Sequence, residues 1–594
     1  MALSLRSSFS KEQQIDIAFL TVVSIAFLGF SLYQIELPGL YGDELDKIVP
    51  TVALLTGQPF LYVAWYMTVF GARIILSFTE YTGPVLVYLP MPFIALFGYT
   101  PFALRLSTVI FGWLTLIFSY LGAKIWFGPW VARFGIALTA VSPAFVFLQR
   151  MGYYNYGPVT LFTSISFFFL ARYISNRKSR DLWASAVFAG IAMNTALQAV
   201  MILAPMAFLA ILFWDIIRPR IRELTIALGL FLIVASPILM MTLKQGGIFK
   251  RIGWSGSNSG SLTLSGFVAT LSEEILHFKG MLGGIDGVQV ENIGRDVRNL
   301  WMDDAFGISI IVLAAFFFIA SDKKEFMRRN AAPLVMTLFG LLLTGFIITG
   351  RATYQLIVLW PFAILVVGAG LAQVPQRFRL VAIALACALV ISQANVTVKA
   401  HQRLSQSGGK IFTSSQIYPL AHYFEERPEL RTIAMEWGLL NQIYFLTGGR
   451  VLPEAIHGWW PRDGIPPDEF NVAVSKQLEN PSNVYIFLGP RQGFDRYPHF
   501  ERLANASKKT IRLEKVFYER DGSIAYRLYT VSTPIYQSEH NIDEETTESL
   551  PGVDISAGEG AGPHDGLRDS VDRDIRSWRG PPRKRPKGRG LHDQ

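Results

Sequence analysis

The stretch that decides the fold begins with the apolar run Ile15–Tyr33, IDIAFLTVVSIAFLGFSLY, and continues as Glu36-Leu37-Pro38-Gly39-Leu40-Tyr41-Gly42-Asp43-Glu44-Leu45-Asp46. A helix that spans a bilayer needs about 20 predominantly apolar residues, so the first run is long enough to cross. No small-residue cleavage site follows it, and we interpret it as a retained anchor rather than a removed signal peptide. The acidic stretch then lies at the mouth of a membrane span.

Further apolar segments of spanning length recur up to residue 391, and the composition agrees with a membrane protein. Of 594 residues, 51% are hydrophobic and only 17% are charged, whereas soluble proteins carry roughly 25% charged residues. This excludes an ordinary cytosolic enzyme, a disordered protein and a disulfide-rich secreted module. The segments after Ile15–Tyr33 are Leu104–Ala123, Val131–Leu148, Tyr156–Tyr173, Leu182–Gln198, Ala199–Trp214, Leu224–Leu243, Ala305–Ala320, Ala332–Thr349, Thr353–Leu371 and Phe378–Ile391.

These segments predict a polytopic α-helical membrane protein with eleven to thirteen spans. The upper figure depends on Phe60–Phe78 and Pro84–Phe97, which are also apolar. They are either a further pair of spans or juxtamembrane helices on the membrane surface. Adding a pair keeps the parity, so the expected orientation is the same for eleven and thirteen spans.

The placement of Lys and Arg predicts that orientation. Under odd parity six basic clusters fall on one side, which the positive-inside rule assigns to the cytoplasm. We therefore expect a multi-pass protein of the plasma (inner) membrane, with a cytoplasmic N-terminus and with the loops 36–103 and 244–304 outside. The clusters are Arg6 and Lys11; Lys124 and Arg133; Arg172, Arg177, Lys178 and Arg180; Arg218, Arg220 and Arg222; Lys323, Lys324, Arg328 and Arg329; and Arg377 and Arg379.

Beyond the membrane module, residues 1–394, the composition turns soluble and predicts an extracytoplasmic α/β domain over residues 395–535. Asn483–Leu488 and Thr432–Trp437 are strand-like, and Leu439–Leu446 has the pattern of a helix stopped by two glycines. Asp521-Gly522 is a hairpin signal between two further strands. Residues 536–594 are polar and charge-segregated and are predicted to be disordered. The net charge of +9 is unevenly spread, so it does not indicate nucleic-acid binding.

The candidate chemistry gathers at the outer ends of the predicted spans. Asp43 and Glu44 are adjacent carboxylates suited to general-base catalysis, because a nearby low-dielectric boundary adjusts the pKa of a carboxyl group; the alternative is a solvated acidic loop. Arg105 begins a span, where it either holds a lipid phosphate, pairs with a carboxylate of the first outer loop, or snorkels to the interface. Further basic candidates at outer positions are Arg150, Lys250, Arg251 and Arg351.

Several of these stretches resemble a known family. The first outer loop with Asp43-Glu44, the stretch Gly83-Pro84-Val85-Leu86-Val87-Tyr88-Leu89, and Ala103-Leu104-Arg105-Leu106-Ser107 resemble lipid-linked-sugar glycosyltransferases of the GT-C fold. The most similar branch is glycosyltransferase family 39, which includes protein O-mannosyltransferases and aminoarabinose transferases. Gly350-Arg351-Ala352-Thr353-Tyr354-Gln355, ahead of Trp360-Pro361, resembles the start of a late span in that family.

The resemblance implies a function. A sugar would pass from a polyprenyl-phosphate donor to a hydroxyl of a lipid, glycan or protein acceptor, with inversion. Asp43 would be the catalytic base with Glu44 beside it, and Arg105 would support that loop or the donor phosphate. Tyr354 stands where a His pair is common, and Glu80-Tyr81-Thr82-Gly83-Pro84 lacks a Lys found in some relatives, so the sugar and acceptor stay open. The donor and substrate candidates are Arg105, Arg351, Tyr354, Glu80, Arg150, Lys250 and Arg251.

Cofactors and other functions stay open at this point. No cofactor is firmly implied, and no His or Cys supports a metal site. A divalent cation held by Asp43, Glu44 and Asp46 is an open alternative. A polytopic transporter would need ionisable residues near the membrane midplane and inverted repeats, and no internal repeat is evident. A non-catalytic membrane scaffold with an outer binding domain leaves the Asp-Glu loop unexplained.

Overall fold

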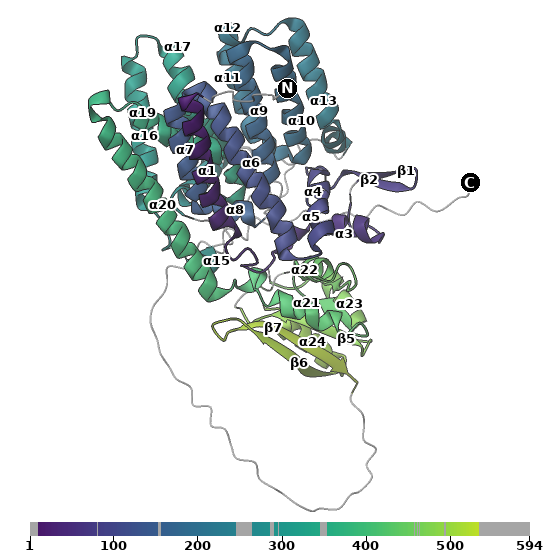
Figure 1. Ribbon diagram of the computed structural model, residues 1–594. Helices are drawn as coiled ribbons and strands as arrows, with labels where there is room; N and C mark the ends of the chain where they lie inside the picture. Colours follow the sequence, from purple (N-terminus) through teal and green to yellow (C-terminus); the bar gives the residue numbers. More distant parts are fainter. Residues whose placement is uncertain are drawn as a thin grey trace, which may run out of the picture.

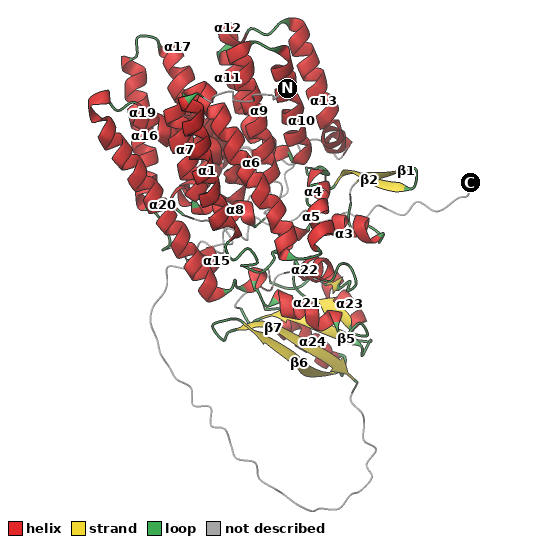
Figure 2. Ribbon diagram, in the orientation of Figure 1, coloured by secondary structure: helices red, strands yellow, loops and turns green. Residues whose placement is uncertain are grey.

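In a computed structural model of the chain, a bundle of helices stands on a small unit of strands and helices (Figures 1 and 2). The bundle carries both the N-terminal helix and most of the apolar sequence, and the strands of the small unit lie at the far end of the molecule. The structure describes residues 10–63, 65–79, 81–151, 156–244, 264–284, 290–294, 296–344, 353–456, 458–459, 461, 464–491 and 495–533. The predicted tail 536–594 lies outside them.

Within this described part, seven helices are long and apolar enough to cross a membrane, and a bent pair makes up to eight. The pair is α7 (Pro129–Val141) and α8 (Pro143–Arg150), which meet at an angle of 60° because Pro143 cannot continue the preceding helix. The seven are α1 (Lys11–Leu32), α6 (Pro101–Phe127), α9 (Tyr156–Asn176), α13 (Ile221–Lys244), α16 (Leu300–Ile319), η5 with α19 (Thr353–Leu359, Trp360–Ala372), and η6 with α20 (Gln376–Phe378, Arg379–Ser407).

Each of the eleven predicted segments contains a helix. Those not among the spans above correspond to the shorter helices α10 (Ser179–Thr195), α11 (Val200–Leu212) and α18 (Ala332–Thr344). The polytopic helical architecture is therefore confirmed. The remaining helices of the membrane half and its loops are α12 (Trp214–Ile217), α14 (Leu264–Gly283), α15 (Val290–Ile293), α17 (Lys323–Phe326) and the π-helical η4 (Met327–Ala331), with a short turn η1 (Leu197–Ala199).

The thirteen-span alternative is wrong, because Phe60–Phe78 is not helical. It forms an antiparallel hairpin of β1 (Trp65–Val69) and β2 (Ala72–Ser77). The turn residues Phe70 and Gly71 both have positive φ, 48° and 79°, which is the twist that a two-residue hairpin needs. The other segment, Pro84–Phe97, forms α4 (Val85–Tyr88) and α5 (Met91–Phe97), which are too short to span and agree with juxtamembrane helices.

The basic clusters that are described gather at one end of the bundle, opposite the small α/β unit (Figure 1). Because α1 starts at that end, this arrangement agrees with the expected odd parity. Direct contacts join the clusters: Asp16 of α1 with Lys124 and Arg133, Arg379 with the ring of Trp130, Trp126 with the carbonyl of Arg328, Lys324 with Asp215, and Arg177 with the carbonyl of Ile217.

The C-terminal unit is a five-stranded sheet with helices on both faces. The strand order is β4-β3-β5-β7-β6, parallel between β4, β3 and β5 and antiparallel from β5 to β6. The apolar side chains of α21 and α22 form a core on one face, and those of α23 and α24 form a second core on the other. The elements are α21 (Ile417–Glu425), β3 (Arg431–Ala434), α22 (Leu439–Leu446), β4 (Glu454–Ala455), α23 (Asp468–Gln477), β5 (Asn483–Leu488), α24 (Tyr497–Ala506), β6 (Thr510–Tyr518) and β7 (Ile524–Ser532), preceded by the turn η7 (Ile411–Thr413).

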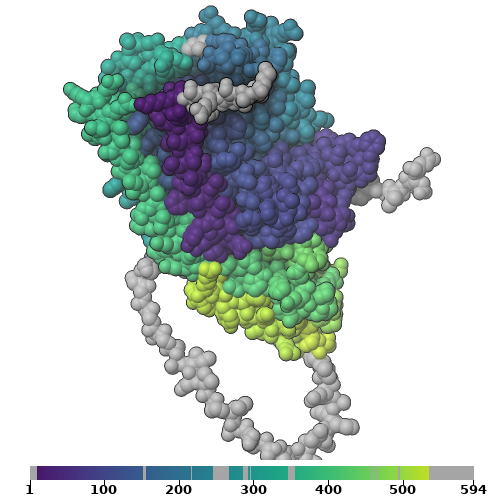
Figure 3. Space-filling model, viewed as in Figure 1, coloured from purple at the N-terminus to yellow at the C-terminus, as the bar shows by residue number. Residues whose placement is uncertain are grey.

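The expected boundary after residue 394 falls inside the helix α20, which runs unbroken from Arg379 to Ser407. The small unit also packs directly on the first outer loop. Leu45 of α2 (Gly42–Leu45) and Val52 of α3 (Val49–Thr56) share a buried core with Phe445 of α22. The membrane half and the C-terminal domain therefore meet at the acidic stretch. Figure 3 shows α1, in purple, running down one face to this domain.

Candidate functional site

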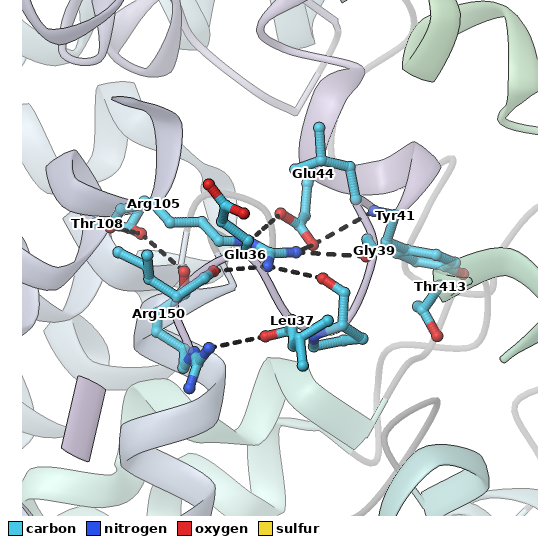
Figure 4. A network of polar contacts seen from close by, with 12 residues as sticks. Glu36, Leu37, Gly39, Tyr41, Glu44, Arg105, Thr108, Arg150 and Thr413 are labelled. Atoms are coloured by element: carbon cyan, nitrogen blue, oxygen red, sulfur yellow. Dashed lines mark hydrogen bonds and ion pairs between the residues drawn. The ribbon is translucent and has the colours of Figure 1, made fainter. Parts of the chain in front are cut away.

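The first outer loop is held by the guanidinium group of Arg105, which is completely buried near the start of α6 (Figure 4). Its Nη2 and Nε donate to the two carboxylate oxygens of Glu44, at 2.9 and 3.2 Å. Its Nη1 donates to the carbonyls of Ile35 and Pro38, both at 2.8 Å, and its Nη2 also reaches the carbonyl of Gly39 at 3.3 Å. The planar fork of arginine suits this arrangement, because it presents several donors in fixed directions to one carboxylate and a curled backbone.

A second buried arginine, Arg150 at the end of α8, binds the other carbonyls of the same loop (Figure 4). Its guanidinium donates to the carbonyls of Tyr33 at 2.9 Å, of Leu37 at 2.7 Å, and of Gln34. The two arginines together donate to six backbone carbonyls between residues 33 and 39. Since each carbonyl needs a donor when it is removed from water, the pair fixes the path of the chain from α1 to α2.

Asp43 lies in α2, one residue before Glu44, and its side chain is only 1% exposed. Burial raises the pKa of Asp43 well above its usual range, and the charge of the neighbouring Asp46 raises it further, while Lys47 acts in the opposite direction. Asp46 follows three residues later on the same helical turn, and the ionisation of each of the two carboxyl groups affects the other. Two neighbouring carboxylates repel each other, so the ionisation of one disfavours that of the other.

Asp46 is in turn bound by one residue distant in the sequence and by its direct neighbour. The amide Nδ2 of Asn441, from α22 of the C-terminal domain, donates to Asp46 Oδ1 at 2.5 Å. Lys47 Nζ lies 3.7 Å from Asp46 Oδ2 and is 3% exposed. Burial raises the pKa of Asp46, whereas the charge of Lys47 and the hydrogen bond from Asn441 lower it. The paired carboxyl groups thus lie where the two halves of the chain meet.

The residues around Asp43 and Asp46 pack closely together. The ring of Trp437 lies 5.4 Å from that of Tyr41, and a Cβ atom on Gly42 would come within 2.7 Å of the Cα of Gly438. A small cavity of about 10 Å³ is lined by Glu44 and Lys47. A larger groove of about 550 Å³ lies between the end of α1 and the C-terminal domain, next to Glu36 and Tyr418. Asp43 lines neither of these two cavities.

The structure thus brings four predicted site residues, Asp43, Glu44, Arg105 and Arg150, to one loop. For Arg105, of the roles left open, pairing with a carboxylate of the first outer loop is confirmed. Glu80, Lys250, Arg251 and Arg351 lie outside the described residues, and only the backbone of Tyr354 is described, in η5.

Sequence reasoning did not identify three residues around the Asp43–Asp46 pair: Lys47, Asn441, and Tyr62, whose hydroxyl donates to Asn441 Oδ1. The sequence could have identified Lys47, because a lysine directly follows the acidic stretch. It could not have identified Asn441, because no local pattern connects this residue with Asp46, 395 positions away.

The possible cation site of Asp43, Glu44 and Asp46 does not have the geometry of one. Glu44 turns to Arg105, whereas Asp43 and Asp46 face each other beside Lys47. In the part of the chain that is described, no three His, Cys, Asp or Glu side chains converge in a way that could hold a metal ion. The cation next to the pair is the side chain of Lys47.

Comparisons with known proteins agree with this architecture. Residues 82–241 match the family model of dolichyl-phosphate-mannose-protein mannosyltransferase. No curated protein matches the chain significantly. Among solved structures, ArnT from Cupriavidus metallidurans in the apo state is similar, with a TM-score of 0.54 and 12% identity over 87% of this chain and 98% of that one.

Two further structures have a TM-score of 0.50. One is the same ArnT bound to undecaprenyl phosphate, 12% identical over 87% of this chain and 98% of that chain. The other is the archaeal oligosaccharyltransferase AglB from Archaeoglobus fulgidus in complex with an inhibitory peptide and a dolichol-phosphate. It is 13% identical, over 89% of this chain and 75% of that chain. The matched family segment and the shared fold identify the chain as a multi-pass glycosyltransferase of the GT-C fold that resembles the enzymes of family 39.

Proposed function

We propose that this protein transfers a sugar from a polyprenyl-phosphate donor to an acceptor hydroxyl on the extracytoplasmic side of the plasma (inner) membrane, with Asp43 as the base. The observation that carries the proposal is the buried Asp43 carboxyl group beside the half-buried Asp46, at the junction of the helix bundle and the C-terminal domain. A fixed, partly desolvated carboxylate at headgroup depth is what a lipid-bound sugar requires. The undecaprenyl phosphate and dolichol-phosphate in the similar structures support a donor of this class.

The chemistry follows from the environment of Asp43. In its ionised form Asp43 takes the proton from the acceptor hydroxyl, whose oxygen attacks the anomeric carbon. The bond from that carbon to the phosphate oxygen breaks, and the lipid phosphate leaves with both electrons, which inverts the anomeric centre. Because burial raises the pKa of Asp43, the carboxylate is a stronger base than an exposed aspartate. General-base assistance of this kind accelerates a reaction by about 10²–10⁴.

The two arginines of the loop act here as positioning residues. Arg105 and Arg150 direct their guanidinium groups to Glu44 and to loop carbonyls, so they keep Asp43 in place. In our proposal Arg351, Lys250 and Arg251 neutralise the leaving phosphate, and Glu80 and Tyr354 contact substrate. Lys47, a buried cation beside the pair, joins them as a candidate. The acceptor is a lipid, glycan or protein hydroxyl.

The orientation belongs to the same proposal. With the N-terminus in the cytoplasm, the basic end of the bundle faces inward and the acidic pair faces outward, where a translocated lipid-linked sugar is presented. A transporter would need its ionisable residues near the membrane midplane, and a scaffold would not need a carboxyl pair at this junction. The pair therefore favours the enzyme over these alternatives.

The test compares three carboxylates of the first outer loop. Purified full-length protein is incubated with radiolabelled polyprenyl-phosphate sugars and membrane extract, and the labelled product is identified. Asp43→Asn keeps the size and removes the base, and we expect it to lower transfer by about 10²-fold or more. Glu44→Gln should cost less, and the exposed Glu36→Gln serves as the matched control with full transfer. Full transfer by the Asp43→Asn protein would refute the catalytic role of Asp43.

A further inference from the structure

The C-terminal domain reaches the acidic pair through one side chain. Asn441 lies in the first turn of α22 and is 8% exposed. Its Nδ2 donates to Asp46 Oδ1 at 2.5 Å, and the charge of Asp46, three residues from Asp43 on the same helical turn, raises the pKa of Asp43. Polar interactions therefore connect α22 with the proposed base.

The orientation of the Asn441 amide is fixed from its other side. The hydroxyl of Tyr62, from the segment between α3 and β1, donates to Asn441 Oδ1. Rotating the amide by about 180° would place its oxygen against the carboxylate of Asp46, where two acceptors would repel each other. Tyr62 and Asp46 therefore select the same rotamer, with the N–H group directed at the carboxylate.

We propose that Asn441 is a positioning residue for the reaction, which orients Asp46 against Asp43 and makes the C-terminal domain a working part of the active site. The proposal rests on the proposed function, because it takes Asp43 as the base. Nothing in the position of Asn441 along the chain assigns it this role. Its consequence is that a change in how the C-terminal domain packs on the loop alters the proton affinity of Asp43.

The direction of that effect follows from the charges around the pair. The groups that face Asp43 and Asp46 are Lys47, Tyr41 and Tyr62 of the outer loop, Tyr156 of α9, and Asn441. The Asn441 donor favours the ionised form of Asp46, and an ionised Asp46 raises the pKa of Asp43. Removing the donor raises the pKa of Asp46, so Asp46 stays neutral to higher pH. Because a neutral Asp46 does not repel the Asp43 carboxylate, the pKa of Asp43 then falls.

The test measures the ionisation of Asp43 directly in the purified full-length protein. Infrared difference spectra are recorded across a pH titration for the wild type and for Asp43→Asn. The carbonyl band that is present in the wild type and absent in this variant belongs to protonated Asp43. We expect its midpoint to fall by about one pH unit in Asn441→Ala and by as much in Asn441→Leu, which fills the space of the amide without a donor. Tyr62→Phe, which only frees the amide to rotate, should give a smaller shift in the direction of Asn441→Ala.

The matched control is Tyr444→Phe, on the same helix. The Tyr444 hydroxyl donates to Gln58 Oε1 of the outer segment at 3.1 Å, so it joins the same two parts without reaching a carboxylate. We expect no shift of the midpoint in this variant. Equal falls for Ala and Leu at position 441 support the proposal, since an effect of loosened packing would be smaller in the Leu variant, which keeps the volume of the side chain. Unchanged midpoints in Asn441→Ala, Asn441→Leu and Tyr62→Phe would overturn it.

The two proposals fail separately. If Asp43→Asn retains full transfer, the proposed base is wrong, whatever the infrared midpoints show. If Asp43→Asn is inactive and the Asn441 variants leave the midpoint in place, only the role of Asn441 falls. In the transfer assay the Ala and Leu variants at position 441 should both shift the acid limb of the pH profile of kcat/KM to lower pH.

Discussion

Replacing Arg105 by Met tests whether the buried arginine holds the loop that carries Asp43. Methionine keeps much of the apolar stem and removes every donor, which leaves Glu44, 2% exposed, as a buried carboxylate without its cation. Breaking a buried ion pair by removing one partner costs about 3–5 kcal/mol. The carbonyls of Ile35, Pro38 and Gly39 also lose a donor, which adds about 1 kcal/mol each where water cannot enter. We therefore expect a loss of at least about 4 kcal/mol in the free energy of unfolding.

The double variant Arg105→Met with Glu44→Gln supplies the decisive comparison. Because the amide that replaces the Glu44 carboxylate carries no charge, no uncompensated anion stays buried, and the double variant should be less destabilised than the sum of the single ones by about 2 kcal/mol. Unfolding is followed by tryptophan fluorescence during denaturation in detergent micelles. Arg403→Met is the control, since its ion pair with Asp296 at 3.0 Å is exposed on both sides and is worth about 0–1 kcal/mol. Losses that simply add, or an Arg105→Met protein as stable as the control, would refute the reasoning.

Three further predictions concern other parts of the molecule. Reporter fusions after Arg180 and after Lys410 should lie in opposite compartments, and equal readings would contradict the proposed topology. Burial raises the pKa of Glu519 from its ordinary value of 4.5 to about 7. Between these two pH values the folded protein binds a proton at Glu519 that the unfolded chain does not. The free energy of unfolding therefore falls as the pH rises from 4.5 to about 7. Glu519→Gln should therefore raise the thermal midpoint at about pH 8 and leave it unchanged at about pH 4; equal effects at both would argue against a buried titrating carboxyl. A Cβ on Gly39 would lie 2.0 Å from the carbonyl oxygen of Ser414, whereas one on Gly29 meets nothing within 4 Å. Gly39→Ala should lower the thermal midpoint and Gly29→Ala should not, and equal midpoints would show that the loop is free to move away from the domain.

Local pattern in the sequence determined the elements of this protein. Each of the eleven long apolar segments contains a helix, because a run of apolar residues in lipid must satisfy its backbone hydrogen bonds internally. In the C-terminal domain, β5 and α22 have the predicted bounds. Gly522, with a φ of 84°, makes the expected hairpin turn between β6 and β7. The hairpin at Phe60–Phe78 was missed because apolar content alone does not separate a strand from a short helix.

The roles of the polar side chains were decided only by the tertiary structure. The sequence placed Arg105 at the mouth of a span and left three roles open, since a basic residue there can bind phosphate, pair with an acid or reach the interface. Packing against the curled loop selected the pair with Glu44. Asn441 reaches Asp46 across 395 residues of chain, and Arg150 reaches the same loop from a distant helix. Such contacts leave no local signature, because the free energy of a buried charge depends on which groups the fold brings around it and not on its neighbours in sequence.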